Sequence, residues 1–88
     1  MIRNEFTIID QHGMHARPAA ALVKLSRLFR SEITISRDGR CIQPKSLLNI
    51  LSLALKYGDR ITVEIAGDDE REAAETIGHF FTEEMKKF

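Results

Sequence analysis

The sequence predicts an α+β domain in which three helices cover one face of a four-stranded antiparallel sheet. Short segments alternate apolar and polar residues, longer segments repeat apolar residues at helical spacing, and the two kinds follow in the order βαββαβα. Because alternating strands have one covered and one solvated face, the helices are expected on a single face. The 88 residues suit one compact domain, spanning residues 1–88.

The first strand is expected over residues 2–8, where alternate apolar residues share one face: Ile2, Phe6 and Ile8. Gly13 breaks the alternation and is the expected turn residue. A helix is then expected over residues 16–29. Its apolar residues at helical spacing are Ala19, Ala20, Leu22, Val23 and Leu28.

The segment EITISRDGRCIQ predicts a β-hairpin, because Asp38-Gly39 supplies the two positive φ angles of a type I′ turn. That register places Ile35 opposite Ile42. A short helix follows in PKSLLNILSLALKYG, with Ser46 as its N-cap and Gly58 at its end.

The last strand is expected in RITVEIAG, with its apolar residues facing the core: Ile61, Val63 and Ile65. A final amphipathic helix is expected from about Asp69 to Lys86, with Asp68 or Asp69 as its cap. Its apolar stripe consists of Ala73, Ile77, Phe80 and Phe81.

Composition excludes several functional classes. The chain has 13 basic and 13 acidic residues, so its net charge gives no bias toward nucleic acid or membranes. The single cysteine, Cys41, forms no disulfide within the chain, which fits a reducing compartment. The N-terminus shows no signal-peptide pattern, and no apolar run is long enough for a bilayer. We therefore expect a cytoplasmic domain without membrane insertion.

Charge is unevenly distributed along the chain. Residues 11–31 contain four basic residues and no acid, whereas residues 64–75 contain six acidic residues and one basic residue. These segments are interpreted either as solvated helix faces or, for the basic segment, as a docking face for an acidic partner.

The segment GMHARPAA places a nucleophile and a cation at the start of the first helix. The first backbone N–H groups of a helix lack internal partners and, with the helix dipole, form a site for anions. Pro18 suits a first turn because its missing N–H is not needed there. His15 supplies a ring nitrogen that can attack phosphorus, and Arg17 supplies a bidentate cation for phosphate. An ordinary surface histidine is the alternative.

The chain resembles the HPr family, the histidine-containing phosphocarrier proteins of the bacterial phosphotransferase system. GMHARPAA matches the active-site motif, and KSLLNILSLAL and the element order extend the likeness over the whole chain. The resemblance implies an open-faced sandwich with strand order 1-4-2-3. It also implies that Enzyme I phosphorylates His15 on Nδ1 and that an Enzyme IIA domain receives the group. Arg17 would contact the phosphate at a helix start shaped by Ala16 and Pro18.

This resemblance describes a carrier with a phosphohistidine intermediate rather than a turnover enzyme, and it requires no cofactor. Ser46 matches a serine that a dedicated kinase modifies in many members, linking sugar uptake to catabolite repression and a transcriptional regulator. A purely structural N-cap is the alternative role for Ser46. A regulatory paralogue, from the nitrogen branch or acting through protein binding, is the alternative function.

The second helix is apolar almost all round, so some of its leucines are expected to form an exposed patch. Spacing places Leu47, Leu48 and Leu51 on one face. Arg17, Lys24 and Arg27 of the first helix would form a basic rim beside them. In the family these two helices bind Enzyme I and Enzyme IIA. The alternative is that all the leucines belong to the core.

His12 stands where the family more often has a small polar residue, and either a hydrogen bond to His15 or electrostatic competition with it is expected. A metal site combining these histidines with His79 or Cys41 is the remaining alternative. No CxxC or second ligand pair accompanies them, so no metal is expected.

Overall fold

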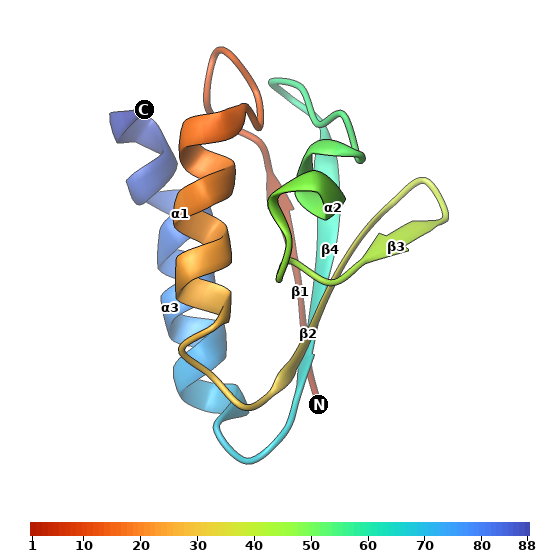
Figure 1. The fold of residues 1–88 in the computed structure, drawn as a ribbon, viewed down its shortest axis with the longest axis vertical. Helices are drawn as coiled ribbons and strands as arrows, with labels where there is room; N and C mark the ends of the chain where they lie inside the picture. The colour runs from red at the N-terminus through yellow and green to blue at the C-terminus, as the bar shows by residue number, and fades with distance from the viewer.

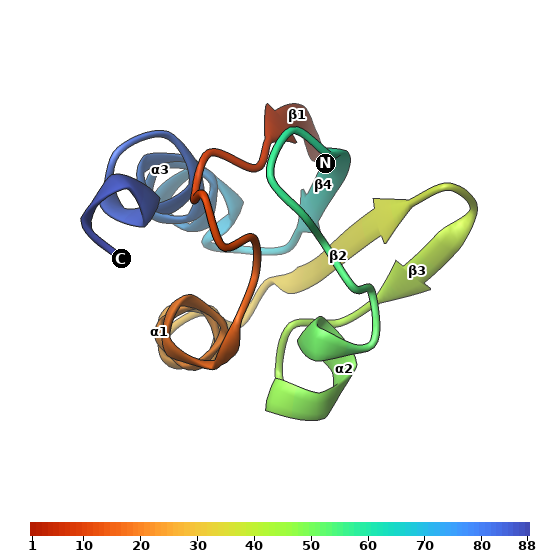
Figure 2. The same cartoon turned by 90° about the horizontal axis from the view of Figure 1, so that it is seen from above.

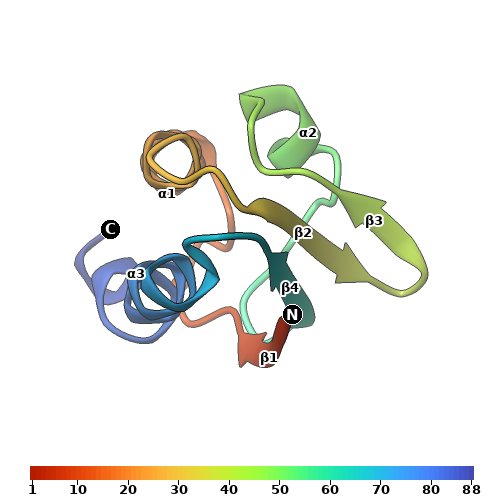
Figure 3. The same ribbon diagram turned by 90° about the horizontal axis from the view of Figure 1, so that it is seen from below.

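A computed structural model describes residues 1–88 and has the expected architecture (Figure 1). One antiparallel sheet is formed, in the order β1-β4-β2-β3, by β1 (Ile2–Thr7), β4 (Arg60–Ala66), β2 (Glu32–Arg37) and β3 (Arg40–Ile42). Three helices lie on one face of it (Figures 2 and 3): α1 (Ala16–Ser26), α2 (Leu47–Leu51) and α3 (Glu70–Thr82). A 3-10 turn, η1 (Glu84–Lys87), follows α3. The fold class and the strand order are both confirmed.

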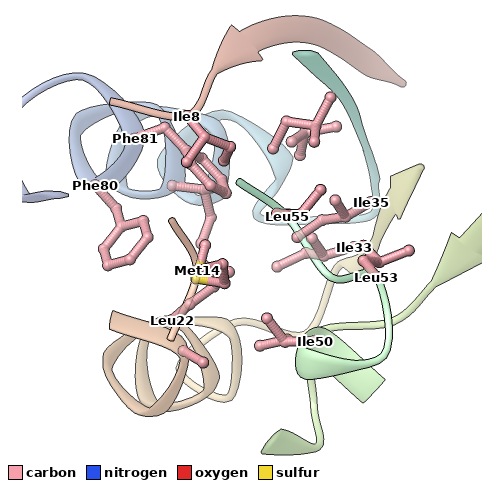
Figure 4. Packing of buried hydrophobic residues seen from close by; sticks show 14 of the residues in the cluster. Ile8, Met14, Leu22, Ile33, Ile35, Ile50, Leu53, Leu55, Phe80 and Phe81 are labelled. Atoms are coloured by element: carbon pink, nitrogen blue, oxygen red, sulfur yellow. The ribbon is translucent and has the colours of Figure 1, made fainter. Parts of the chain in front are cut away.

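Strand register converts the alternating pattern into one apolar face. Ile65 of β4 pairs with Ile2 of β1 and Ile33 of β2, and Val63 pairs with Ile35. The central members of this set are almost completely buried. The helices add side chains to the same core (Figure 4), including Leu22, Ile50, Phe80 and Phe81.

The hairpin and the cap of the second helix form as predicted. Asp38 has a φ of 50° and Gly39 a φ of 82°, and Ile35 pairs with Ile42. The hydroxyl oxygen of Ser46 accepts the backbone N–H of Asn49. These features depend on residues close in sequence, so local chemistry was sufficient to predict them.

Helix α1 is shorter than expected and ends at Ser26 rather than Phe29. The N–H of Leu28 donates to the carbonyl of Leu25, a tighter closure that turns the chain toward β2. Beyond this turn helical spacing no longer applies, and Leu28 is 71% exposed instead of packing in the core. Ala20 is also exposed, because it faces away from buried Ala19.

Helix α2 ends at Leu51, so the expectation that it continues to Gly58 is wrong. The C-cap is Ser52, and two residues later Ala54 adopts a left-handed φ of 51°. Glycine is the usual choice there, but the chain must reverse between Leu53 and Leu55, which are both buried. Gly58 instead lies in the loop before β4.

Helix α3 begins after Asp69, but this carboxylate makes no capping bond. It accepts hydrogen bonds from the backbone N–H of Arg30 (2.8 Å) and from the N–H and hydroxyl of Ser31. These bonds lower the pKa of Asp69 below its ordinary value. The bond from the Ser31 hydroxyl has the largest effect, and the bond from the Arg30 N–H has the next largest. The helix stops at Thr82 rather than Lys86, because Glu83 leaves the helical conformation.

Candidate functional site

The loop that joins β1 to α1 lies at the same end of the molecule as the α2–β4 loop and the C-terminus (Figures 1 and 2). Backbone hydrogen bonds tie the two loops together. The N–H of Ile8 donates to Asp59 O (2.8 Å), and the N–H of Gly58 donates to Ile8 O (2.9 Å). Farther along, the N–H of Met14 donates to Leu55 O (3.0 Å). These bonds position the start of α1 against the rest of the fold.

Gly13 allows the two loops to make this close approach. It adopts a φ of +71°, and a Cβ at this position would meet Leu55 O and lie 2.9 Å from Lys56 Cα. The following residue, Met14, inserts its side chain into the core (Figure 4). Its neighbour His15 is therefore held at the surface by a buried anchor on one side and a helix on the other.

His15 is the N-cap residue of α1, and its side chain is 34% exposed. The backbone N–H groups of Ala16 and Arg17 have no hydrogen-bond partner, and Pro18 has no N–H. The first intrahelical bond runs from Ala19 N–H to His15 O. An accessible imidazole thus lies beside two unpaired donors at the positive end of a helix, which is a favourable place for an anion.

Asp10 contacts the ring of His15, and the sequence analysis did not single it out. Its Oδ2 lies 3.2 Å from His15 Nε2, and its Oδ1 accepts the backbone N–H of His12 (2.8 Å). With Nε2 against a carboxylate, we assign the proton of the neutral ring to Nε2, which leaves the lone pair on Nδ1. The available signal was an acidic residue between the first strand and the turn at Gly13.

His12 does not hydrogen-bond His15, so the first of the two alternatives is wrong, and electrostatic competition stays a prediction. The two rings meet edge to face, with centroids 6.0 Å apart and an interplanar angle of 83°. The bond made by this residue runs through its backbone to Asp10. Its ring lines a surface pocket with Asp10 and two residues of the C-terminal turn, Lys86 and Phe88.

Arg17 lies against the C-terminal residue Phe88. Its guanidinium carbon lies 6.0 Å from the centroid of the Phe88 ring, at cation–π distance. The guanidinium forms no ion pair and no hydrogen bond. Its donors therefore remain free for a ligand at the start of α1.

The second helix exposes part of its apolar surface. Leu48 is 77% exposed and Leu47 39%, so the alternative that all the leucines are core is wrong. Leu51 is half-buried and packs against the core, so it does not share their exposure. We call Leu47 and Leu48 the leucine patch.

The predicted basic rim lies on α1 and at its end. Lys24 and Arg27 are both exposed. The guanidinium of Arg27 donates to the carbonyl of Lys45 (2.9 Å), which links α1 to the residue before Ser46. Ser46 itself is half-buried at the start of α2.

The candidate metal ligands are dispersed. His79 of α3 lies 3.6 Å from Glu84, and Cys41 is exposed on β3. No group of three or more His, Cys, Asp or Glu side chains is placed to hold a metal ion.

None of the helices combines the length and apolar character that crossing a membrane requires.

Comparison with known proteins identifies the class that this fold and site define. A family model described as the phosphotransferase-system HPr component phosphorylation site matches residues 2–83. The phosphocarrier protein HPr of Buchnera aphidicola is 41% identical over 83 residues, covering 94% of this chain and 98% of its own. The chain belongs to the HPr family and is a phosphocarrier of the phosphotransferase system.

Solved structures agree with this assignment. A crystal structure of HPr from Thermoanaerobacter tengcongensis has a TM-score of 0.92 at 30% identity, covering 98% of this chain and 97% of that one. A Bacillus subtilis catabolite-repression protein, Crh, described as a swapped-domain dimer, has a TM-score of 0.75 at 32% identity, with coverage of 96% and 97%.

Proposed function

We propose that His15 accepts a phosphoryl group on Nδ1 from phospho-Enzyme I and passes it to an Enzyme IIA domain of a sugar permease. The observation that carries this proposal is the position of His15. His15 is the N-cap of α1, and its partly exposed ring lies beside the unpaired N–H groups of Ala16 and Arg17. Asp10 contacts Nε2, so Nδ1 is the nitrogen available for attack.

The transfer forms one bond and breaks another. The Nδ1 lone pair forms a bond to phosphorus, while the bond between phosphorus and the donor breaks and its electron pair leaves with the donor. The proton on Nε2 stays in place, so no base is required at this step. The resulting phosphoramidate is labile, which allows the group to be passed on. A phosphoserine would be too stable for such a relay.

Arg17 would hold the transferred phosphate. Its guanidinium has a fork of donors that matches phosphate oxygens, and Arg17 lies two residues after His15, in the first turn of α1. Leaving the Phe88 ring costs about 0.5–1 kcal/mol, whereas hydrogen bonds to a charged group contribute about 1.5–3 kcal/mol each. Phosphate binding is therefore favoured over the contact with Phe88.

The proposal is tested by a reconstituted relay. The protein is mixed with Enzyme I and phosphoenolpyruvate, and the modified residue is mapped by mass spectrometry under conditions that preserve phosphohistidine. We expect acid-labile label on His15, none in His15→Ala, and full label in His12→Ala and His79→Ala. Stoichiometric labelling of folded His15→Ala would overturn the proposal.

The leucine patch, with the rim of Lys24 and Arg27, is the surface we propose for binding Enzyme I and Enzyme IIA. Exposed leucines beside cations suit a partner with an apolar contact area bordered by acidic residues. The patch belongs to α2, which packs beside α1, so a partner bound there would also lie beside the helix that begins at His15.

A regulatory role is the second candidate, favoured by the likeness to Crh. Phosphate on Ser46 would add nearly two negative charges at the start of α2, close to Arg27 and the leucine patch. Incubation with an HPr kinase tests this role, with Ser46→Ala as control. Phosphorylation confined to Ser46 and binding to a transcriptional regulator support it; an unmodified Ser46 contradicts it. Enzyme I from the sugar and nitrogen branches, tested separately, shows which branch labels the protein.

A further inference from the structure

We infer that Asp10 is a positioning residue for phosphoryl transfer: it holds the imidazole of His15 in the Nε2–H tautomer, with the lone pair on Nδ1. The inference rests on the proposed function of His15 and adds a residue outside the GMHARPAA motif. Asp10 acts through His15 and makes no contact with phosphorus.

The carboxylate of Asp10 is held firmly in place. The residue is only 4% exposed, and each side-chain oxygen has a different partner. Oδ1 accepts the backbone N–H of His12 at 2.8 Å, and Oδ2 faces His15 Nε2 at 3.2 Å. The backbone carbonyl of the same residue accepts the N–H of Gly13 at 2.9 Å. Because Oδ1 is already bound, the carboxylate has little freedom to rotate away from the ring.

An ionised carboxylate accepts hydrogen bonds but cannot donate them. Facing Nε2, it favours the neutral tautomer that carries its proton there. The opposite tautomer would place the lone pair of Nε2 against a lone pair of the carboxylate. Its proton would be on Nδ1, which would then have no lone pair with which to attack phosphorus. After transfer the ring is cationic, and Asp10 then provides a negative charge beside Nε2. The same carboxylate therefore prepares the nucleophile and stabilises the phosphorylated ring.

Asp10→Asn separates this role from simple loop support. The amide keeps the shape of the side chain and has one oxygen, which can continue to accept the His12 N–H. Its NH₂ group then faces Nε2 and favours the lone pair there, with the proton on Nδ1. The variant should thus remain folded while the preferred tautomer of His15 is inverted, as happens when the aspartate of a catalytic triad is replaced by asparagine.

The experiment measures the tautomer directly. Two-bond ¹H–¹⁵N spectra of ¹⁵N-labelled protein, recorded where the rings are neutral, distinguish Nδ1–H from Nε2–H for His15. We expect the Nε2–H pattern in the wild type, the Nδ1–H pattern in Asp10→Asn and a mixture in Asp10→Ala. Single-turnover transfer from phospho-Enzyme I should fall by about tenfold or more in Asp10→Asn and by less in Asp10→Ala.

Asp59→Ala is the matched control, because Asp59 supports the neighbouring loop without contacting His15. Its carboxylate accepts the N–H of Lys56 (2.7 Å) and pairs with Arg37 (3.3 Å). This variant should lose stability but keep the Nε2–H pattern of His15.

Two results would overturn the inference. The first is a dominant Nδ1–H pattern for His15 in the wild type, a measurement that does not depend on any variant folding. The second is an Asp10→Asn variant that keeps the wild-type pattern and the wild-type transfer rate. Failure of the proposed function looks different, because His15 would then remain unlabelled in the wild type whatever its tautomer.

Discussion

Arg17 contacts the last residue of the chain: its guanidinium carbon lies 6.0 Å from the centroid of the Phe88 ring. Phe88 is itself supported by α3, with its ring centroid 6.4 Å from that of Phe80. The C-terminal turn therefore holds the cation beside the start of α1 while its donors stay free. A cation–π contact of this kind contributes about 0.5–1 kcal/mol at an exposed site, which is weak enough to exchange for phosphate.

Arg17→Ala should slow phosphoryl transfer to His15, because the charge-assisted bonds to the phosphate are lost. A loss of about 1.5–3 kcal/mol corresponds to roughly a 10- to 150-fold lower rate. Rapid-quench measurement with phospho-Enzyme I gives this rate. Arg17→Lys should recover only part of it, since an ammonium lacks the bidentate fork. Arg71→Ala, which removes an exposed arginine of α3, is the control. If Arg17→Ala and Arg17→Lys transfer the phosphoryl group as fast as Arg71→Ala, Arg17 has no part in the mechanism.

Gly13→Ala should destabilise the loop that carries His15. The substitution combines a left-handed φ of +71° with a Cβ that meets Leu55 O and Lys56 Cα. Gly39→Ala is the matched control, because Gly39 also has a positive φ, of +82°, but open space around it. Backbone strain alone costs of order 1–3 kcal/mol. Urea unfolding should show a larger loss for Gly13→Ala than for Gly39→Ala, and equal losses would contradict the close contact between the loops.

The loss of stability as the pH falls below about 4 should depend on Asp69. Hydrogen bonds from Ser31 and Arg30 lower the pKa of this carboxyl group below 3.8 in the folded protein. A group with a depressed folded pKa stabilises the fold above its unfolded pKa, and this contribution is lost as the pH falls through the folded pKa. Asp69→Asn should therefore be less stable than the wild type at pH 7, with a smaller difference near pH 3.

Thermal unfolding at several pH values measures this dependence, with Asp68→Asn as the neighbouring control. Asp68 is exposed and makes no hydrogen bond to the turn before β2. A pH profile for Asp69→Asn that parallels the wild type would show that these bonds do not contribute to acid stability.

Leu48→Glu should weaken binding to Enzyme I without destabilising the protein. Leu48 is 77% exposed, so little core packing is lost, but a charge would be added to the leucine patch. Leu28→Glu adds the same charge at a similarly exposed leucine beyond the end of α1. Calorimetric titration should show an affinity at least about 30-fold lower for Leu48→Glu, since hot-spot substitutions cost about 2 kcal/mol or more. Equal affinities for the two variants would place the docking surface elsewhere.

Sequence reasoning was most successful where the cause is local. The Asp38-Gly39 turn sets the hairpin register through its own backbone preferences, and the apolar alternation of β4 determines which side chains face inward. Helix ends were predicted less well. Helix α2 ends at Leu51 because residues on both sides of Ala54 must be buried, and that requirement comes from packing rather than from helix propensity.

The sequence by itself determined the fold class, the strand alternation and the motif that places His15 at the start of a helix. These depend on periodicity and on residues within one or two turns. Only the tertiary structure decided the neighbours of the site: the carboxylate of Asp10 at Nε2, the ring of Phe88 under Arg17 and the exposure of Leu48 beside buried Ile50. Such neighbours depend on how loops and chain ends meet in space. Residue spacing and composition do not specify which residues far apart in the sequence come into contact.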